Sequence, residues 1–262
     1  QPCRYPETAD SSLCTRIVTQ QDPTDRIYAQ PMGEVTDFAF DSRVARVFPD
    51  MIRRSVPGYD TVIDMTGVLA AQCVQPDSTC YDLGCSLGAS LLAMHRGLKA
   101  ENCRLIGIDN SPEMLQQAQQ YMPPDDSPPP VELRCADVTQ VEISNASMVV
   151  LNFTLQFIAP RQRLNLLARI RNGLLPGGIL LLSEKIRFAD PQQEALQIDM
   201  HHAFKRANGY AELEISQKRS ALEKVLLPET LQQHQQRLAQ AGFRRSERWF
   251  QCFNFVSMVA WR

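Results

Sequence analysis

The chain has little of what marks a membrane, secreted or nucleic-acid-binding protein. No apolar run approaches the ~18 residues that a membrane span needs, and no apolar segment reads as a signal-peptide core. The 27 Lys and Arg residues are balanced by 29 Asp and Glu, a net charge of −2, so no basic surplus attracts nucleic acid through charge alone. We therefore expect a cytoplasmic protein with no membrane contact and no stable nucleic-acid partner.

Disulfide and metal patterns are also missing. The eight cysteines never form C-x-x-C, and their spacing in a chain of this size does not suggest a disulfide framework. We interpret them as reduced thiols packed like small hydrophobic side chains. The adjacent His201 and His202 would point about 100° apart on a helix, and His95 and His234 are isolated. We expect no metal site.

What the chain does have is enough apolar sequence for a large core. With 262 residues and 44% hydrophobic content, it can form one large α/β domain. Residues 1–23 are polar and aperiodic, and we expect a disordered or weakly docked extension there. The rest, 24–262, is expected to be a single domain, with residues 24–41 as an arm laid over it.

Apolar strands alternate with amphipathic helices through the middle of the chain, which predicts a doubly wound parallel sheet. Two helices precede the first strand, and Pro49 is expected to break the first of them or to begin it. Residues 186–227 interrupt the alternation as a helical insertion of two or three helices, expected to form a lid. The last two strands, joined at Phe253, must pair antiparallel because their connection is too short for a crossover. The five parallel strands and the hairpin are expected at 78–83, 104–109, 131–135, 148–151, 179–182, 245–252 and 254–261, a mostly parallel seven-stranded sheet.

The stretch Ser78–Gly88 reads as a strand, a glycine turn and the start of a helix. Its Asp82-x-Gly84-x-Ser86-x-Gly88 pattern resembles the D-x-G-x-G-x-G loop with which class I methyltransferase folds hold S-adenosyl-L-methionine. Gly84 permits a sharp turn, and the helix start offers unpaired N–H groups. Ser86 stands where that loop usually has glycine. Alone, the pattern is also compatible with an ordinary strand-to-helix turn.

Polar residues recur at the predicted carboxyl ends of the first four strands, where open parallel sheets bind ligands. Asp109 ends the second strand, 27 residues after Asp82, and can accept both hydroxyls of a ribose. Gly84, Asp137 and Asn152 complete the set. A Rossmann oxidoreductase is the nearest alternative, but its G-x-G-x-x-G spacing does not fit residues 84–89.

The usual tools of methyl transfer are absent from the sequence. After the fourth strand the chain reads Asn152-Phe153-Thr154-Leu155, which matches neither the [DNS]-P-P-[FWY] motif of amine methyltransferases nor the P-C of cytosine C5 enzymes. No general base follows either. Arg219, in the predicted lid, could bind a carboxylate with both arms of its guanidinium, although a Lys-Arg pair more often lies on a solvated helix face.

Over residues 24–262 the sequence resembles the carboxy-S-adenosyl-L-methionine synthases of the bacterial tRNA wobble-uridine 5-oxyacetate pathway. The resemblance lies in eight stretches of the printed sequence: 38–52, 54–59, 81–88, 108–112, 145–157, 204–210, 212–220 and 249–255.

The resemblance implies an enzyme that carboxylates the methyl group of S-adenosyl-L-methionine, with prephenate supplying carbon dioxide and leaving as phenylpyruvate. It also implies a homodimer, in which Arg219 could serve its own site or its neighbour's. Lys185, Lys205 and Arg206 are guesses for the prephenate carboxylates. The alternatives are an ordinary methyltransferase acting on a small molecule or tRNA, and a non-catalytic cofactor-binding subunit. The implied cofactor residues are Tyr59, Gly84, Cys85, Ser86, Asp109, Asn110, Asp137, Val138 and Asn152, with Arg219 holding the new carboxylate.

Overall fold

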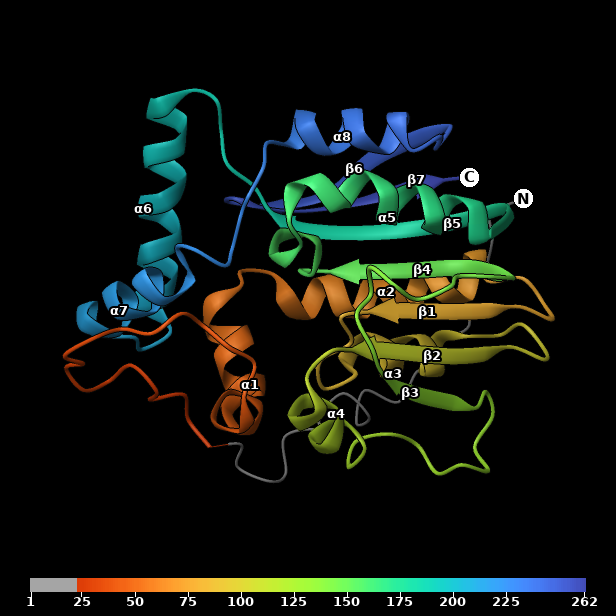
Figure 1. Ribbon diagram of the computed structural model, residues 1–262, viewed down its shortest axis with the longest axis horizontal. Coiled ribbons are helices and arrows are strands. Elements are labelled where there is room, and N and C mark those ends of the chain that lie inside the picture. The colour runs from red at the N-terminus through yellow and green to blue at the C-terminus, as the bar shows by residue number, and fades with distance from the viewer. Residues whose placement is uncertain (1–22) are drawn as a thin grey trace, which may run out of the picture.

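A seven-stranded sheet organises residues 23–262, the part of the chain that the computed structural model describes. The strand order is β3-β2-β1-β4-β5-β7-β6. Strands β1 to β5 are parallel, while β7 pairs antiparallel with both β5 and β6. The expected mostly parallel sheet with a C-terminal hairpin is therefore confirmed (Figure 1). The strands are β1 (Thr79–Leu83), β2 (Arg104–Asp109), β3 (Val131–Cys135), β4 (Ala146–Asn152), β5 (Leu174–Lys185), β6 (Arg245–Cys252) and β7 (Phe255–Trp261).

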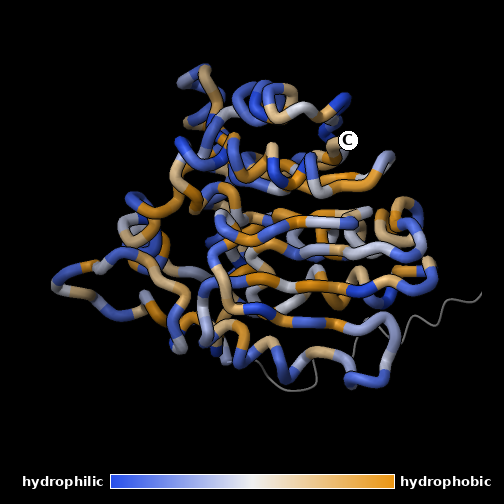
Figure 2. The backbone as a smooth tube through the Cα atoms, turned by 45° about the vertical axis from the view of Figure 1, so that its right-hand side comes forward, coloured by the Kyte–Doolittle hydropathy of each residue, from blue (hydrophilic) through white to orange (hydrophobic). Residues whose placement is uncertain are grey.

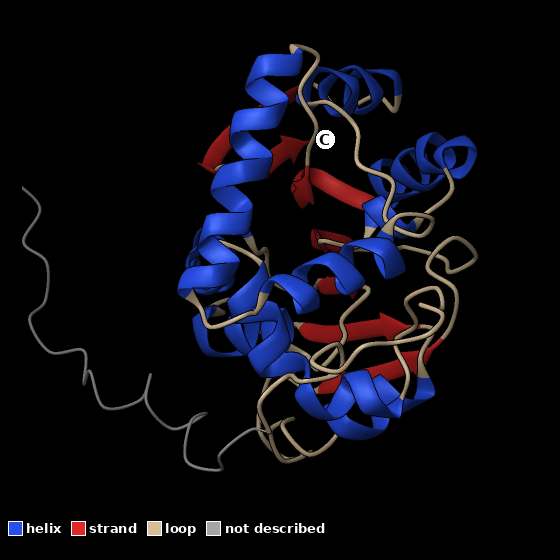
Figure 3. Ribbon diagram, turned by 90° about the vertical axis from the view of Figure 1, so that its left-hand side faces the viewer, coloured by secondary structure: helices blue, strands red, loops and turns tan. Residues whose placement is uncertain are grey.

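Helices cover both faces of this sheet (Figure 3). Alternate residues of a strand point to opposite faces, so Tyr81 and Leu83 pack with α5 and α8 while Cys80 packs with α2 and α3. The strands accordingly carry much of the hydrophobic colour in Figure 2. The helices are α1 (Ser42–Ser55), α2 (Tyr59–Cys73), α3 (Ala89–Gly97), α4 (Pro112–Ala118), the 3₁₀ turn η2 (Leu155–Phe157), α5 (Pro160–Gly173), α6 (Pro191–Ala207), α7 (Glu212–Leu222) and α8 (Leu231–Gln240).

The expectation that Pro49 breaks or begins a helix is wrong, because α1 runs through it from Ser42 to Ser55. A proline inside a helix removes one hydrogen bond and costs about 3 kcal/mol. The apolar face of α1, which includes Val44, Phe48 and Met51, is buried, and burying each such side chain contributes about 1.5–3 kcal/mol. Packing therefore outweighs the local propensity.

The insertion 186–227 contains two helices, α6 and α7. They lie with α1 beyond the carboxyl ends of the parallel strands, on the left of Figure 1. The arm before α1 is hydrogen-bonded to α7: the Phe38 N–H donates to the Ala221 carbonyl (2.9 Å) and the Met32 N–H to Gln217 Oε1 (2.8 Å). Arm and insertion thus cover the same end of the sheet. The expected extension at 1–23 lies, apart from residue 23, outside the described residues.

Candidate functional site

The loop after β1 adopts a conformation that explains its glycines. Gly84 has φ +79, and a Cβ there would lie 2.3 Å from Thr154 Oγ1. Gly88 has φ +81 and a similar clash with Met122. Ser86, which replaces the usual glycine, also has positive φ, +49. The Asp109 carboxylate accepts the Ser86 N–H at 2.9 Å, so a side-chain contact helps to hold a backbone conformation that only glycine adopts freely.

A cavity of about 850 Å³ lies at the carboxyl edge of the sheet, bounded by this loop, α1, the segment after β4, and the insertion helices. Its volume is at the upper end of the ~300–1,000 Å³ usual for small-molecule sites, large enough for two reactants. Nine of the ten expected site residues line it: Tyr59, Gly84, Cys85, Ser86, Asp109, Asn110, Asp137, Val138 and Asn152.

Carboxylates gather at the end of the cavity formed by β1, β2 and β3. Asp82 is 2% exposed, and its Oδ2 has no hydrogen-bond partner in residues 23–262. Burial, together with the neighbouring Asp109, raises the pKa of Asp82 to about 8. Asp109 accepts the N–H groups of Ser86 and Ser111, both at 2.9 Å, and burial raises its pKa as well. An unpaired buried carboxyl group fits a cationic ligand, and the glycine loop leaves room for one.

Asn152, at the end of β4, is fixed by hydroxyl groups. Its Nδ2 donates to Ser90 Oγ at 3.0 Å, and its Oδ1 accepts from Ser183 Oγ at 2.6 Å. Ser183 in turn contacts Ser257 at 2.8 Å. The Asn152 amide is therefore a rigid part of the cavity wall, whose side-chain hydrogen bonds are largely satisfied by the protein.

Aromatic rings form the middle of the cavity. Phe153 lies between Tyr59 and Phe255, with ring centroids 6.2 and 6.1 Å away. Its φ is +61, which is strained for a bulky residue and typical of functional sites. Burial raises the pKa of the Tyr59 phenol, so that it stays neutral. Phe153 and Phe255 were not predicted as wall residues. The absence of a Pro-Pro motif after Asn152 indicated that this wall differs from that of amine methyltransferases.

Ammonium groups gather at the opposite end, which is formed by β5, α6 and α7. Lys185, Lys205 and Lys218 line the cavity, together with the buried His201. Lys218 was not predicted as a site residue. It is held in place by Asp25, which lies 193 residues away along the chain (Nζ to Oδ2, 3.4 Å), and no local sequence pattern indicates that pair.

Two expected basic residues lie elsewhere. Arg206 pairs with Glu212 at 2.8 Å on the surface and does not line the cavity. Arg219 is exposed on α7 and does not line it in this single chain. Burial lowers the pKa values of Lys185, Lys205 and His202, and the positive charge of Arg219 adds to this effect. The role expected of Arg219 remains a prediction.

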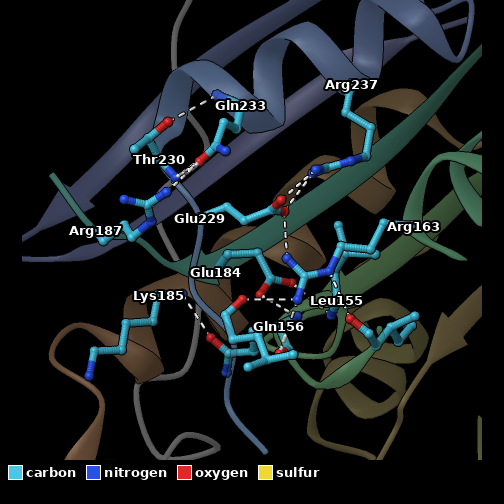
Figure 4. A network of polar contacts seen from close by, with 12 residues as sticks. Leu155, Gln156, Arg163, Glu184, Lys185, Arg187, Glu229, Thr230, Gln233 and Arg237 are labelled. Carbon is cyan, nitrogen blue, oxygen red and sulfur yellow. Dashed lines mark hydrogen bonds and ion pairs between the residues drawn. The ribbon is translucent and has the colours of Figure 1, made fainter. Parts of the chain in front are cut away.

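A buried polar network supports the wall from behind (Figure 4). Glu184 accepts the N–H groups of Leu155 and Gln156, both at 2.9 Å, and so caps η2. Arg163, whose side chain is 0% exposed, donates to the Leu227 carbonyl (2.9 Å) and pairs with Glu229 (2.5 Å). Figure 4 shows the Lys185 side chain directed away from this network. Glu184 and Lys185 thus point to opposite faces of β5. Glu184 supports the wall from behind, and Lys185 lines the cavity.

In residues 23–262 no three His, Cys, Asp or Glu side chains are grouped so that they could hold a metal ion. Across the same residues, no helix combines the length and apolarity that a bilayer crossing requires.

Comparison with known proteins assigns the class. Residues 81–178 match the family described as "Methyltransferase domain". A solved structure from Methanococcus maripaludis, described as a putative S-adenosyl-L-methionine-dependent methyltransferase, superposes with a TM-score of 0.56 at 18% identity over 88% of this chain and 96% of that one. The fold and the glycine loop thus define a class I S-adenosyl-L-methionine-dependent methyltransferase fold.

Closer relatives narrow this class to one enzyme family. The chain is 58% identical, over 91% of its length and 98% of the relative's, to a carboxy-S-adenosyl-L-methionine synthase of Geobacter sp. (strain M21). It is 59% identical, over 90% of its length and 94% of the relative's, to a protein of the same name from Marinobacter nauticus. The chain belongs to the carboxy-S-adenosyl-L-methionine synthase family, and the resemblance found in the sequence is confirmed.

Proposed function

We propose that the chain converts S-adenosyl-L-methionine and prephenate into carboxy-S-adenosyl-L-methionine and phenylpyruvate, and so supplies the carboxymethyl donor for tRNA wobble-uridine modification. The observation that carries the proposal is the polarity of the cavity. Carboxylates from β1 to β3 form one end and ammonium groups from β5 to α7 the other, with aromatic rings between. Such a cavity suits a cationic sulfonium and a doubly anionic partner side by side.

The residues at the acidic end hold the adenosyl substrate in this proposal. Each Asp109 oxygen already accepts one backbone N–H and keeps a second lone pair for a ribose hydroxyl. The unpaired Oδ2 of Asp82 faces a positive group of the substrate. Tyr59 and Phe153 present ring faces, which attract a sulfonium as they attract other cations. Gly84, Cys85, Ser86, Asn110, Asp137, Val138 and Asn152 complete this end.

The reaction balances without a base from the protein. Prephenate loses its ring carboxylate as carbon dioxide and its ring hydroxyl as hydroxide, and the ring becomes aromatic. The hydroxide takes a proton from the methyl group next to the sulfonium and leaves as water, and that carbon forms a bond to carbon dioxide. Asn152, Phe153 and Thr154 beside the cavity carry no titratable side chain, in keeping with a proton acceptor brought by the donor. The aromatic wall keeps water away from the reacting atoms.

Mass spectrometry of the product tests the proposal. The protein is incubated with S-adenosyl-L-methionine labelled in its methyl group, with and without prephenate. We expect a labelled product heavier by one carboxyl group, and phenylpyruvate in equal amount, when prephenate is present. S-adenosyl-homocysteine together with a methylated acceptor would instead establish an ordinary methyltransferase, and binding without turnover would establish a non-catalytic subunit.

We further propose that the active form is a cytoplasmic homodimer in which Arg219 holds the new carboxylate. The cysteines within residues 23–262 are all free thiols, as in compartments that keep thiols reduced. Arg219 is exposed on α7 and does not line the cavity of its own chain, so it is available to a second copy or after movement of the insertion. We also propose that the chain consists of an extension at 1–23 and a single domain at 24–262, in which residues 186–227 form the lid.

A further inference from the structure

Two lysines at the basic end of the cavity, the buried Lys205 and the partly buried Lys185, have no bonded counterion among residues 23–262. In the part of the chain that the structure describes, neither Lys185 nor Lys205 has a hydrogen-bond or ion-pair partner for its Nζ, although both line the cavity and Lys205 is only 7% exposed. Lys218, by contrast, is paired with Asp25 and donates to Ser55 Oγ at 2.9 Å. Burying a charge without a partner is costly, so a bound anion would stabilise the charged forms of Lys185 and Lys205.

The surroundings of these lysines are mostly positive. Lys205 faces Lys218, Lys185 and Arg219, and it lies beside His201 and His202 on α6. Burial, followed by these charges, lowers the pKa of Lys205 to about 7. Lys185 has one acidic neighbour, Glu194, against the positive Arg219. His201 does not add charge: its Nε2 lies 2.8 Å from the Ser55 carbonyl, and burial lowers its pKa to about 2.

We propose that Lys185 and Lys205 form an anion subsite that binds the retained α-keto acid end of the carbon dioxide donor. This inference rests on the proposed function and specifies where its second substrate lies. Together the two ammonium groups offer six N–H donors, enough for a carboxylate and the adjacent keto oxygen. Lys218 adds positive charge at the same end of the cavity, but it is already paired with its own counterion, Asp25.

The assignment to the retained carboxylate follows from the chemistry. A carboxylate that leaves as neutral carbon dioxide gives up its charge, so a cation bound to it would stabilise the ground state and slow the reaction. The departing group therefore belongs beside the aromatic wall of Tyr59 and Phe153, next to the adenosyl end. The keto acid keeps its charge throughout, and binding it on lysines positions the donor without opposing the chemistry.

Kinetics of Lys185→Met and Lys205→Met test this subsite. We expect KM for prephenate to rise roughly 10- to 100-fold in each variant, the range for loss of a charge-assisted hydrogen bond, while the Kd for S-adenosyl-L-methionine stays as in the wild type. Lys99→Met, an exposed lysine after α3, is the matched control, and Arg206→Met tests whether lid charge alone matters. Neither should change KM. Unchanged KM in both lysine variants, with an active wild type, would overturn the subsite; an inactive wild type would instead overturn the proposed function.

Arginine substitution separates binding from proton transfer. Lys205→Arg should recover most of the affinity for prephenate and keep kcat within a few fold, because arginine binds carboxylates but does not lose its proton. In the wild type, KM should rise as pH increases above about 7, since Lys205 loses its charge there; in the arginine variant the rise should begin only near pH 8, where Lys218 loses its charge. Normal prephenate binding without turnover in Lys205→Arg would show that Lys205 acts as a base and would overturn the proposal.

Discussion

At the scale of single residues, Gly84 is a position in the cavity wall where an added methyl group should harm both the backbone and the site. It combines a left-handed backbone with a Cβ position 2.3 Å from Thr154. We expect Gly84→Ala to weaken binding of S-adenosyl-L-methionine at least 10-fold and to lower the free energy of unfolding by about 1–3 kcal/mol. Calorimetric titration and urea unfolding measure the two effects. Gly33→Ala is the matched control, because in residues 23–262 no atom beyond its chain neighbours lies within 4 Å of that added Cβ; equal effects of both changes would contradict the argument.

Asp82 makes a second prediction at this scale, for the pH dependence of binding. Its pKa of about 8 in the ligand-free protein means that it is largely protonated at pH 6. A cationic ligand favours the carboxylate, so binding below pH 8 must release a proton. Affinity for S-adenosyl-L-methionine should therefore rise as pH increases from 6 to 7.5, by up to about 10-fold per pH unit.

Asp82→Asn is the variant that isolates this effect. The amide is neutral at every pH, so its affinity should be lower than that of the wild type at pH 7.5 and nearly independent of pH. Calorimetric titration in buffers of different ionisation enthalpy would count the released proton directly. Parallel pH profiles for wild type and variant would show that another group titrates.

At the scale of elements, Glu184 links β5 to η2 through two backbone N–H groups. Burial raises its pKa to about 8, although those N–H groups and Arg163 oppose the shift. The unfolded-state value is about 4.3, so the folded chain binds the extra proton between pH 4.3 and 8. The contribution of Glu184 to stability is therefore greatest below pH 4.3 and is lost as pH rises toward 8.

Glu184→Gln should remove that dependence. We expect the free energy of unfolding of the wild type, measured relative to the variant by urea denaturation, to fall by about 1–3 kcal/mol between pH 5 and 8. The exposed Glu142 provides the control, since Glu142→Gln should leave the profile of the wild type unchanged. A difference that grows in favour of the wild type with increasing pH would mean that the ionised carboxylate is the form the network stabilises.

Elements also show what the sequence could and could not predict. Alternation of apolar strands and helices is a local signal, and it located β2 and β3 at their observed bounds. The polar residues that end the strands were predictable for the same reason, because parallel strands bring their carboxyl ends to one edge. Pro49 was misjudged because the packing that holds α1 together is tertiary. The pairs Lys218–Asp25 and Arg163–Glu229 join segments 193 and 66 residues apart, and no local pattern announces them.

At the scale of the whole molecule, the role proposed for Arg219 requires its guanidinium to reach a carboxylate in one of the two cavities of a dimer. The cavity is bipolar and nearly complete within one chain, yet this guanidinium lies exposed on α7 and outside the lining. A twofold-symmetric dimer places the same surface of each subunit against the other. In the proposed homodimer, Arg219 would therefore serve either the neighbouring cavity, in a crossed arrangement, or its own cavity after movement of α7.

Mixing two impaired variants, at a concentration of S-adenosyl-L-methionine too low for either to act alone, distinguishes crossed from uncrossed sites. Arg219→Leu keeps an intact cavity, and Gly84→Ala keeps an intact arginine. If each arginine serves the other subunit, random exchange makes half the dimers mixed, and one site in each mixed dimer has both intact parts. Activity should then return to about a quarter of the wild-type level, with carboxy-S-adenosyl-L-methionine as the measured product. Arg219→Leu mixed with itself is the control and should stay inactive. Persistent inactivity of the mixed sample, once exchange is verified by native mass spectrometry, would mean that α7 moves and that each subunit completes its own site.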